Sequence, residues 1–140
     1  MKRNLLITSL LAVSLLATSG CTKTSNGDSN TNGPTPLTGD WKLTYYYSNG
    51  TIKTDDYAGY VFDFKPKNAL TATARAQSVA GVWAISTDDA TQKMNINFNT
   101  GDNNLSALTN DWHVVFVSET KVELADNDAA TSDQVHFTRQ

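Results

Sequence analysis

The chain contains one cysteine, Cys21, and few basic residues for its 140 positions. A single cysteine excludes an internal disulfide, so a folded domain in this chain must be held together by its own apolar core. Without residues 1–20 the chain keeps nine of its eleven Lys and Arg residues and all fourteen Asp and Glu residues, which gives a formal charge of −5. A negative chain with scattered acids has neither the electrostatic footprint of a nucleic-acid-binding protein nor a basic face for anionic lipid.

The start of the chain has the features of an export signal. Lys2 and Arg3 precede an apolar run over 5–17 that is too short to span a membrane as a stable helix. The residues that follow, Ala-Thr-Ser-Gly-Cys, resemble a lipobox, the cleavage and acylation motif of bacterial lipoproteins, with Thr18 where that motif usually has Leu. The sequence therefore predicts cleavage before Cys21 and lipid modification of its thiol.

A polar segment separates Cys21 from the rest of the chain. Residues 22–37 read TKTSNGDSNTNGPTPL, which offers almost nothing to bury and predicts a disordered tether. The expected organisation is a signal peptide over 1–20, the lipidated cysteine with its tether over 21–37, and one domain over 38–140. That domain is close to the common size of roughly 100 residues.

Apolar residues in this domain recur with period two, and no long stretch shows the spacing of a helix. The pattern predicts strands near 40–48, 59–65, 70–74, 80–86, 93–98, 112–116, 122–124 and 135–137. Asn49-Gly50 accepts the positive φ angles of a tight hairpin and predicts the first turn. An open meander of eight strands would leave two bare edges, and closure removes them. The sequence therefore predicts an all-β fold, an up-and-down eight-stranded antiparallel barrel.

Residues at both ends of this predicted barrel carry a family resemblance. Gly39-Asp40-Trp41 opens the first strand and Arg139 closes the last, and together they resemble the G-x-W motif and the terminal Arg of lipocalins. Bacterial lipoproteins with a lipocalin-like domain share the plan of signal, tether and small barrel. Antiparallel closure brings the two ends together, and we expect Arg139 to lie over Trp41 as a cation–π lid on the barrel floor.

Alternation also predicts which side chains fill the barrel. Tyr46 is expected outside, where it would mark a contact surface or be an ordinary solvated strand residue. The expected inward set is Trp41, Leu43, Tyr45, Tyr47, Tyr60, Phe62, Phe64, Leu70, Ala72, Ala74, Trp83, Ile85, Met94, Ile96, Phe98, Trp112, Val114, Phe116, Val122, Leu124, Val135 and Phe137. Most of these groups are large, so they should occupy nearly all of the short interior.

Any pocket should therefore be shallow and lie at one mouth of the barrel. We expect it around the small residues Ala72, Ala74 and Gly81, which leave room on the inner face. Tyr47 and Trp83 are the expected walls. These five residues form the predicted ligand site.

Histidine and acidic residues bind metals in many proteins, but in this sequence they are not expected to form a metal site. His113 and His136 fall on outward positions of separate strands, without the further ligands that a zinc site needs. The acidic segment 126–133 resembles a calcium loop, but Ala130 stands where a further oxygen ligand is required. A solvated turn is the expected structure. The sequence predicts no metal and no cofactor.

The sequence also lacks the arrangements that catalyse reactions. No serine lies in a nucleophile elbow, and the lipid occupies the thiol of Cys21. Adjacent acids such as Asp55-Asp56 point to opposite faces if they lie on a strand, so they cannot flank one bond. We therefore expect a protein that is not an enzyme.

Two functions remain open at this stage. The lipocalin resemblance implies a binding module whose barrel holds a small apolar ligand. The alternative is an interaction or scaffold module of the cell envelope with a filled barrel core. Thr22 follows the cysteine where an inner-membrane retention signal would place Asp, so we expect an outer-membrane lipoprotein, facing either the periplasm or the surface. In both readings the contact with the membrane is made by the lipid, and nucleic acid is not a partner.

The lipid anchor gives a first testable prediction. Expressed with its own signal, the protein should incorporate labelled palmitate and partition into a detergent phase. Cys21→Ser should abolish both properties, because it removes the thiol that is acylated. Palmitate incorporation that is unchanged in this variant would contradict the lipoprotein prediction.

Overall fold

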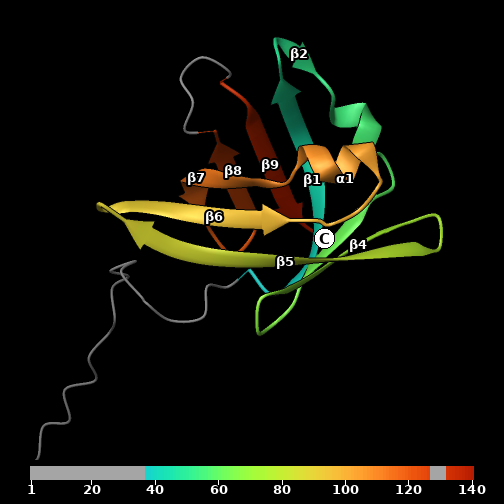
Figure 1. The fold of residues 1–140 in the computed structure, drawn as a ribbon, viewed down its shortest axis with the longest axis horizontal. Coiled ribbons are helices and arrows are strands. Elements are labelled where there is room, and N and C mark those ends of the chain that lie inside the picture. Colours follow the sequence, from blue (N-terminus) through green and yellow to red (C-terminus); the bar gives the residue numbers. More distant parts are fainter. Residues whose placement is uncertain (1–36, 127–131) are drawn as a thin grey trace, which may run out of the picture. The chain divides into compact units, whose positions relative to one another are not determined.

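A computed structural model describes residues 37–126 and 132–140, and shows a domain built almost entirely of strands (Figure 1). The predicted signal peptide, Cys21 and the tether as far as residue 36 lie outside the described residues. The elements are β1 (Gly39–Ser48), β2 (Thr51–Ile52), the 3-10 helix η1 (Thr54–Tyr57), β3 (Val61–Phe64), β4 (Ala69–Ala74), β5 (Gln77–Asp88), β6 (Thr91–Asn97), α1 (Asn103–Ala107), β7 (Asn110–Val117), β8 (Lys121–Ala125) and β9 (Gln134–Arg139). Neither helix of this part of the chain has the length and hydropathy of a membrane-spanning segment.

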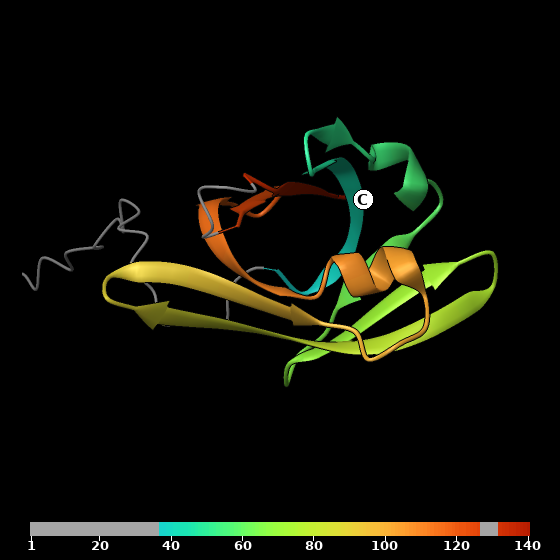
Figure 2. The same ribbon diagram turned by 45° about the horizontal axis from the view of Figure 1, so that its top comes forward.

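The strands form a closed antiparallel barrel, as the sequence predicted (Figure 2). β2 is a two-residue strand that forms a hairpin with the end of β1, and the other eight strands follow one another around the barrel. β9 pairs with β1 to close it, with Trp41 opposite Arg139 and Tyr47 opposite Gln134. The predicted Asn-Gly hairpin is confirmed, since Asn49 and Gly50 have φ angles of 51° and 79°.

The barrel has two different ends, which we call the floor and the mouth. The floor end holds the start of β1, the end of β9, and the β3–β4, β5–β6 and β7–β8 turns. The mouth end holds the β1–β2 turn, η1, the β4–β5 turn and α1. β3 pairs with only the first part of β1, and η1 packs against the remainder of that strand.

The barrel interior is filled with apolar side chains that form one cluster. The largest of those that are fully buried are Trp41, Trp112, Phe62, Phe137, Leu37, Leu70, Met94, Ile96, Leu105, Leu108, Leu124 and Val135. Each of the three tryptophan N–H groups donates to a backbone carbonyl: Trp41 to Leu37, Trp83 to Lys65 and Trp112 to Leu108. The core therefore holds its large indole groups without leaving a buried donor unpaired.

The floor is closed by the residues that carry the lipocalin resemblance. The Arg139 guanidinium lies 4.6 Å from the centroid of the fully buried Trp41 ring, so the predicted cation–π lid is confirmed. The same guanidinium donates to the carbonyl of Thr38 at 2.8 Å. Gly39 has a φ of +123°, and a Cβ there would lie 2.8 Å from Arg139 Nη1. Glycine is needed at this position both for its backbone conformation and for the room it leaves.

A β-bulge in β1 makes the predicted side-chain orientation wrong for three tyrosines. The pairing with β9 shifts register between Leu43 and Tyr45, which adds one residue and reverses the alternation that follows. Tyr46 therefore points inward and is only 3% exposed, whereas Tyr45 and Tyr47 lie on the outer face. The predicted contact surface at Tyr46 does not exist.

A second bulge has the same effect in β7. The pairing with β8 shifts between Val114 and Phe116, so Phe116, expected in the core, is 48% exposed. Trp112, which precedes the bulge, is buried as predicted. In both strands the prediction holds up to the bulge and fails after it.

Simple alternation places both Trp41 and Phe116 in the core, whereas the structure buries only Trp41. The two residues should therefore contribute differently to the free energy of unfolding. Trp41→Ala should lower the free energy of unfolding by about 3 to 5 kcal/mol, because it empties a core site and removes the group under Arg139. Phe116→Ala should lower it by less than about 1 kcal/mol, because the ring is half exposed. Chemical denaturation of both variants would measure the difference. Equal losses would contradict the placement of Phe116 outside the barrel.

Candidate functional site

The residues of the predicted ligand site do not form one pocket in the structure. The β1 bulge turns Tyr47 to the outer face, so it cannot be a wall of an interior pocket. Ala72 is buried in the core at 1% exposure, and Ala74, two residues further along β4, is partly exposed. Trp83 packs edge-on against Phe64, with ring centroids 5.5 Å apart.

The room that Gly81 was expected to leave is taken by a neighbouring ring. A Cβ at Gly81 would lie 2.6 Å from Cδ1 of Phe98, so the missing side chain accommodates this buried phenylalanine. Gly81 also borders a shallow surface hollow of about 220 Å³ between β5 and the end of β6. This volume is below the roughly 300 Å³ at which small-molecule sites begin.

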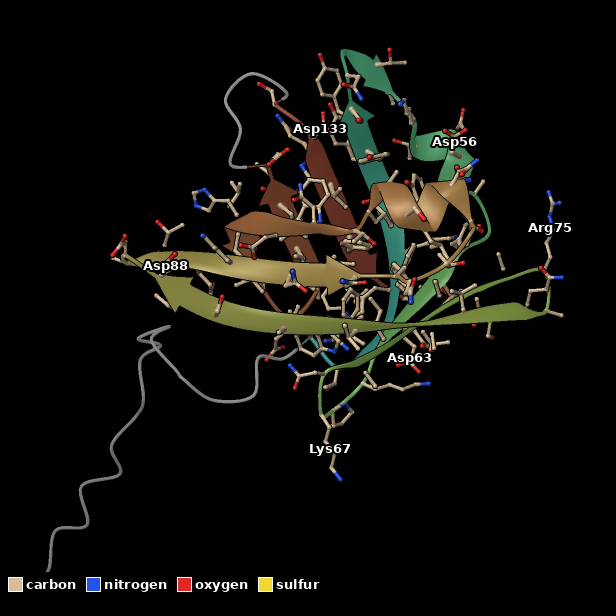
Figure 3. All side chains as sticks on the ribbon, viewed as in Figure 1. Asp56, Asp63, Lys67, Arg75, Asp88 and Asp133 are labelled. Carbon is tan, nitrogen blue, oxygen red and sulfur yellow. The ribbon has the colours of Figure 1, made fainter. Side chains whose placement is uncertain are left out.

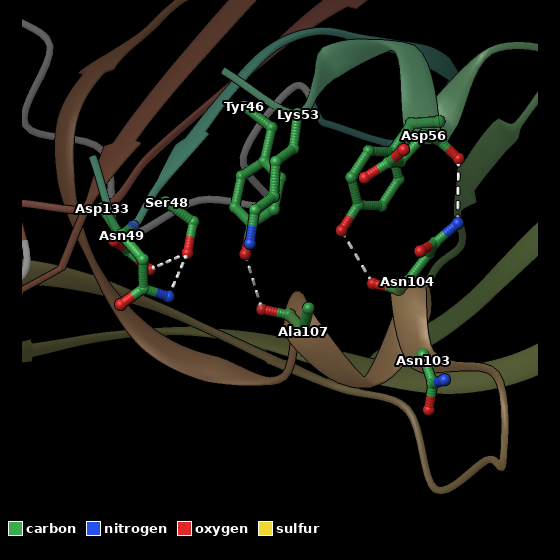
Figure 4. Close-up of a pocket in the computed structure, with 10 residues that line it drawn as sticks. Tyr46, Ser48, Asn49, Lys53, Asp56, Asn103, Asn104, Ala107 and Asp133 are labelled. Atoms are coloured by element: carbon green, nitrogen blue, oxygen red, sulfur yellow. Dashed lines mark hydrogen bonds between the residues drawn. The ribbon is translucent and has the colours of Figure 1, made fainter. Parts of the chain in front are cut away.

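A larger cavity, of about 440 Å³, lies at the mouth of the barrel (Figure 4). Three segments far apart in the sequence build it: residues 46–57, which run from the end of β1 through η1, residues 103–107 of α1, and Asp133, which directly precedes β9. It is lined by Tyr46, Ser48, Asn49, Lys53, Asp56, Tyr57, Asn103, Asn104, Ala107 and Asp133. The volume falls within the roughly 300 to 1,000 Å³ of small-molecule sites. This mouth cavity is the candidate functional site.

Asp133 holds one side of the mouth cavity together. Its carboxylate accepts a hydrogen bond from the Ser48 hydroxyl at 2.7 Å and another from the Asn49 backbone N–H at 3.1 Å. The Asn49 side-chain amide donates in turn to Ser48 Oγ at 3.1 Å. Bonds that involve a charged group are stronger than neutral ones. They join the β1–β2 turn to the segment that precedes β9.

Two buried tyrosines lie at the base of the mouth cavity and connect it to α1. The Tyr46 hydroxyl donates to the Ala107 carbonyl at 3.2 Å, and the Tyr57 hydroxyl donates to the Asn104 carbonyl at 2.8 Å. Their rings meet edge to face with centroids 5.2 Å apart. Burial raises the pKa of both hydroxyls, so both stay protonated and their hydrogens remain directed at α1.

Asp102 fixes the start of α1. Its carboxylate accepts hydrogen bonds from the backbone N–H groups of Asn104 and Leu105, at 2.9 and 3.1 Å, and so serves as the N-cap. It also accepts a bond from the Tyr60 hydroxyl at 2.7 Å. The Tyr60 bond, followed by the backbone bond from Leu105, lowers the pKa of Asp102 below its usual value. A short helix that would be marginal alone is thereby held beside η1.

Three charged groups face the mouth cavity. Figure 4 shows Asp133 and Asp56 on opposite sides of Lys53, and Figure 3 shows both acids at one end of the barrel with Lys67 at the other. Lys53 is half-buried, and within the described part of the chain its ammonium makes no hydrogen bond or ion pair. The lining therefore combines one cation that is free to bind with two carboxylates, a formal charge of −1.

Of the residues that were considered as metal ligands, His113 and His136 lie on separate strands, β7 and β9, whereas Asp126 and Asp133 flank one hairpin. Among residues 37–126 and 132–140, no three His, Cys, Asp or Glu side chains are grouped so as to hold a metal ion. His136 lies on the outer face against Tyr45, with ring centroids 4.8 Å apart, and burial lowers its pKa. Asp133 serves the hydrogen bonds at the mouth. The middle of the predicted acidic turn, 127–131, lies outside the described residues.

None of the five residues of the predicted ligand site lines the mouth cavity. The lining comes from a turn, two short helices and a strand end, none of which has a periodic apolar pattern. Asp102, followed by Asn103-Asn104-Leu105, is an N-cap signal that could have indicated α1. No pattern in the sequence indicates that this helix meets η1.

Comparison with known proteins supports the fold. No protein-family profile and no curated protein matches the sequence. Among solved structures, a DUF4847 family protein from Bacteroides vulgatus is similar, with a TM-score of 0.54 and 16% identity over 74% of this chain and 93% of that chain. A lipocalin-like protein from Bacteroides uniformis gives a TM-score of 0.49 and 16% identity over 75% of this chain and 99% of that chain. At 16% identity, the first of these similarities shows a shared fold and nothing more.

The role of Asp102 gives a prediction about stability and its dependence on pH. Asp102→Ala should lower the free energy of unfolding at neutral pH by about 0.5 to 2 kcal/mol, the usual cost of losing an N-cap. The pKa of Asp102 is lower in the folded state than in the unfolded state, so its stabilisation is present above the unfolded value and is lost as pH falls through the folded value. The difference between the two proteins should therefore shrink in acid.

Urea denaturation at neutral pH and well below the usual pKa of an Asp, about 3.9, would measure both effects. Asp55→Ala is the matched control, because Asp55 is exposed in η1 and its carboxylate makes no hydrogen bond within the described residues. A loss for Asp102→Ala that does not change with pH would contradict the inferred ionised cap.

Proposed function

We propose that this protein is a lipid-anchored, non-enzymatic protein of the cell envelope that binds a small ligand at the mouth of its barrel. The observation that carries the proposal is the cavity of about 440 Å³, placed over an interior already filled by apolar side chains. A packed barrel supplies a rigid base for such a site. Rigid elements hold binding groups more precisely than free loops do.

The place where the chain enters the barrel supports a tethered binding role. Leu37 is buried at the floor, where its carbonyl accepts the Trp41 N–H at 2.7 Å. A tether that precedes Leu37 therefore joins the barrel at the end opposite to the mouth cavity. If Cys21 is acylated as proposed, the lipid is attached on the floor side, and the cavity is left open to solutes. The absence of Asp after the cysteine favours the outer membrane.

The character of the cavity favours a polar ligand over the apolar one that the lipocalin resemblance implied. Carboxylates, amides, hydroxyls and an ammonium line the mouth cavity, whereas the apolar interior positions are occupied by the core cluster. Most small-molecule sites are predominantly apolar, with a few polar groups that fix orientation. Slightly more than half of the lining surface is polar, so the cavity offers an apolar molecule fewer favourable contacts than a predominantly apolar site would.

One observation favours the alternative, an interaction module. Val115 and Phe116 are adjacent on β7 and are 60% and 48% exposed, because Val115 faces outward by alternation and the bulge turns Phe116 outward beside it. Exposed apolar groups that lie together can mark contacts with another protein. This pair is small, and the mouth cavity is the more specific feature.

The binding proposal can be tested with cavity-filling variants. The full chain, purified from its own envelope, should carry a bound small molecule that is detected by native mass spectrometry. Ala107→Trp places a large ring in the mouth cavity and should remove the bound mass. Ala80→Trp fills the hollow beside Gly81 instead and serves as the matched control, which should keep the bound mass.

The possible results separate the two functions. Loss of the bound mass in Ala107→Trp alone supports the mouth site. Loss in Ala80→Trp alone contradicts it and supports a ligand beside Gly81. A protein without any bound mass contradicts the binding proposal and leaves the interaction module.

A further inference from the structure

We propose that the ligand of the mouth cavity is an uncharged polyhydroxylated molecule, a mono- or disaccharide, held by Lys53, Asp56 and the neighbouring asparagines. This inference rests on the proposed binding function and adds the chemical class of the ligand. Several donors and acceptors of the site have no partner within the described residues, and these groups determine what kind of ligand can bind.

The site offers several acceptors that no internal bond occupies fully. Asp56 lines the cavity, and its carboxylate makes no hydrogen bond within the described residues. Its backbone N–H donates to the Lys53 carbonyl at 3.2 Å, and its backbone carbonyl accepts from the Asn104 side-chain amide at 2.9 Å. The Tyr46 and Tyr57 hydroxyls have given their hydrogens to α1 carbonyls, so neither can donate to a ligand. A ligand must therefore donate hydrogen bonds to this side of the site.

The same site offers donors from other side chains. The Lys53 ammonium has three N–H bonds and no internal partner within the described residues. Asn103 is exposed at the first residue of α1, and its side-chain amide makes no internal hydrogen bond in that part of the chain. A ligand must therefore also accept hydrogen bonds, close to the groups to which it donates. A hydroxyl group does both, and a sugar carries several of them on a compact ring.

The charges of the lining exclude the simpler ionic ligands. A phosphate or carboxylate would be attracted by Lys53 but repelled by Asp56 and Asp133, which lie on either side of it (Figure 4). A cation would meet the Lys53 ammonium. A neutral molecule avoids both penalties and still gains charge-assisted hydrogen bonds from Lys53 and Asp56.

The buried tyrosines explain why the site suits a hydroxylated ring better than an apolar one. Tyr46 and Tyr57 are each 3% exposed, so neither ring offers the cavity an open face on which an apolar group could pack. An apolar ligand would gain little from rings that are already buried, and it would leave the lysine and carboxylate without water or partner.

Solution NMR of the full chain in detergent micelles can test this inference. The probes are D-glucose, D-galactose, D-mannose, D-xylose, L-fucose, N-acetyl-D-glucosamine and the disaccharide maltose, with inorganic phosphate and palmitate as the ionic and apolar comparisons. We expect at least one saccharide to shift the backbone amide signals of Asn49, Lys53, Asp56 and Asn104 in a saturable way. Phosphate and palmitate should leave these signals in place.

Variants then connect the binding to particular groups. Lys53→Met and Asp56→Asn should each weaken the saccharide by about tenfold or more, the effect of removing a hydrogen bond to a charged group. The matched controls are Lys42→Met, an exposed lysine on the outside of β1, and Asp55→Asn, the neighbouring acid that does not line the cavity. Both controls should keep the affinity, and thermal melts should show that all four variants are folded.

The outcomes separate this inference from the binding proposal on which it rests. A saturable saccharide response that Lys53→Met and Asp56→Asn weaken, and the controls do not, supports the inference. If phosphate or palmitate shifts the mouth amides and no saccharide does, the ligand class is wrong and the mouth site stands. If no probe shifts them and the native protein carries no bound mass, both proposals fail.

Discussion

Antiparallel hydrogen bonds between β1 and β9 close the barrel, and both of its ends depend on this pairing. At the floor the register places Trp41 opposite Arg139, which sets the guanidinium over the indole ring. At the mouth the same ladder places Tyr47 opposite Gln134, which brings Asp133 to the turn that follows β1. A sheet that remained open would have two free edges and neither of these contacts. The structural floor and the candidate site are thus consequences of a single strand pairing.

The bulge within that pairing connects the barrel wall to the elements that build the mouth. By adding one residue it turns Tyr46 inward, where its ring meets Tyr57 of η1 and its hydroxyl reaches α1. A strand without the bulge would place Tyr46 in solvent and direct its neighbours inward. Bulges are common beside functional sites because they redirect a side chain without breaking the sheet. Without this bulge, Tyr46 would not lie at the base of the mouth cavity.

The sequence was informative where a regular repeat determines structure. Alternation located the strands, and the Gly39, Trp41 and Arg139 positions predicted how the barrel closes at its floor. It failed at Tyr46, Tyr47 and Phe116, because a bulge depends on pairing with another strand and leaves no trace in the local pattern. It also missed the mouth cavity, whose lining is brought together by contacts between residues as distant as Ser48 and Asp133. A short N-cap signal at Asp102 indicates where a helix can begin, but not which segment the helix will contact.

The entry of the chain through the floor has a mechanical consequence. A force applied between Leu37 at the floor and the mouth of the barrel acts along β1, which runs from one end to the other. The hydrogen bonds of an antiparallel ladder lie across the strands, so a pull in this direction loads many of them together instead of unzipping them one at a time. The Trp41 and Arg139 contact lies first in the path of the force. A barrel held in this way can resist drag on its mouth while the strands that form its wall keep their register.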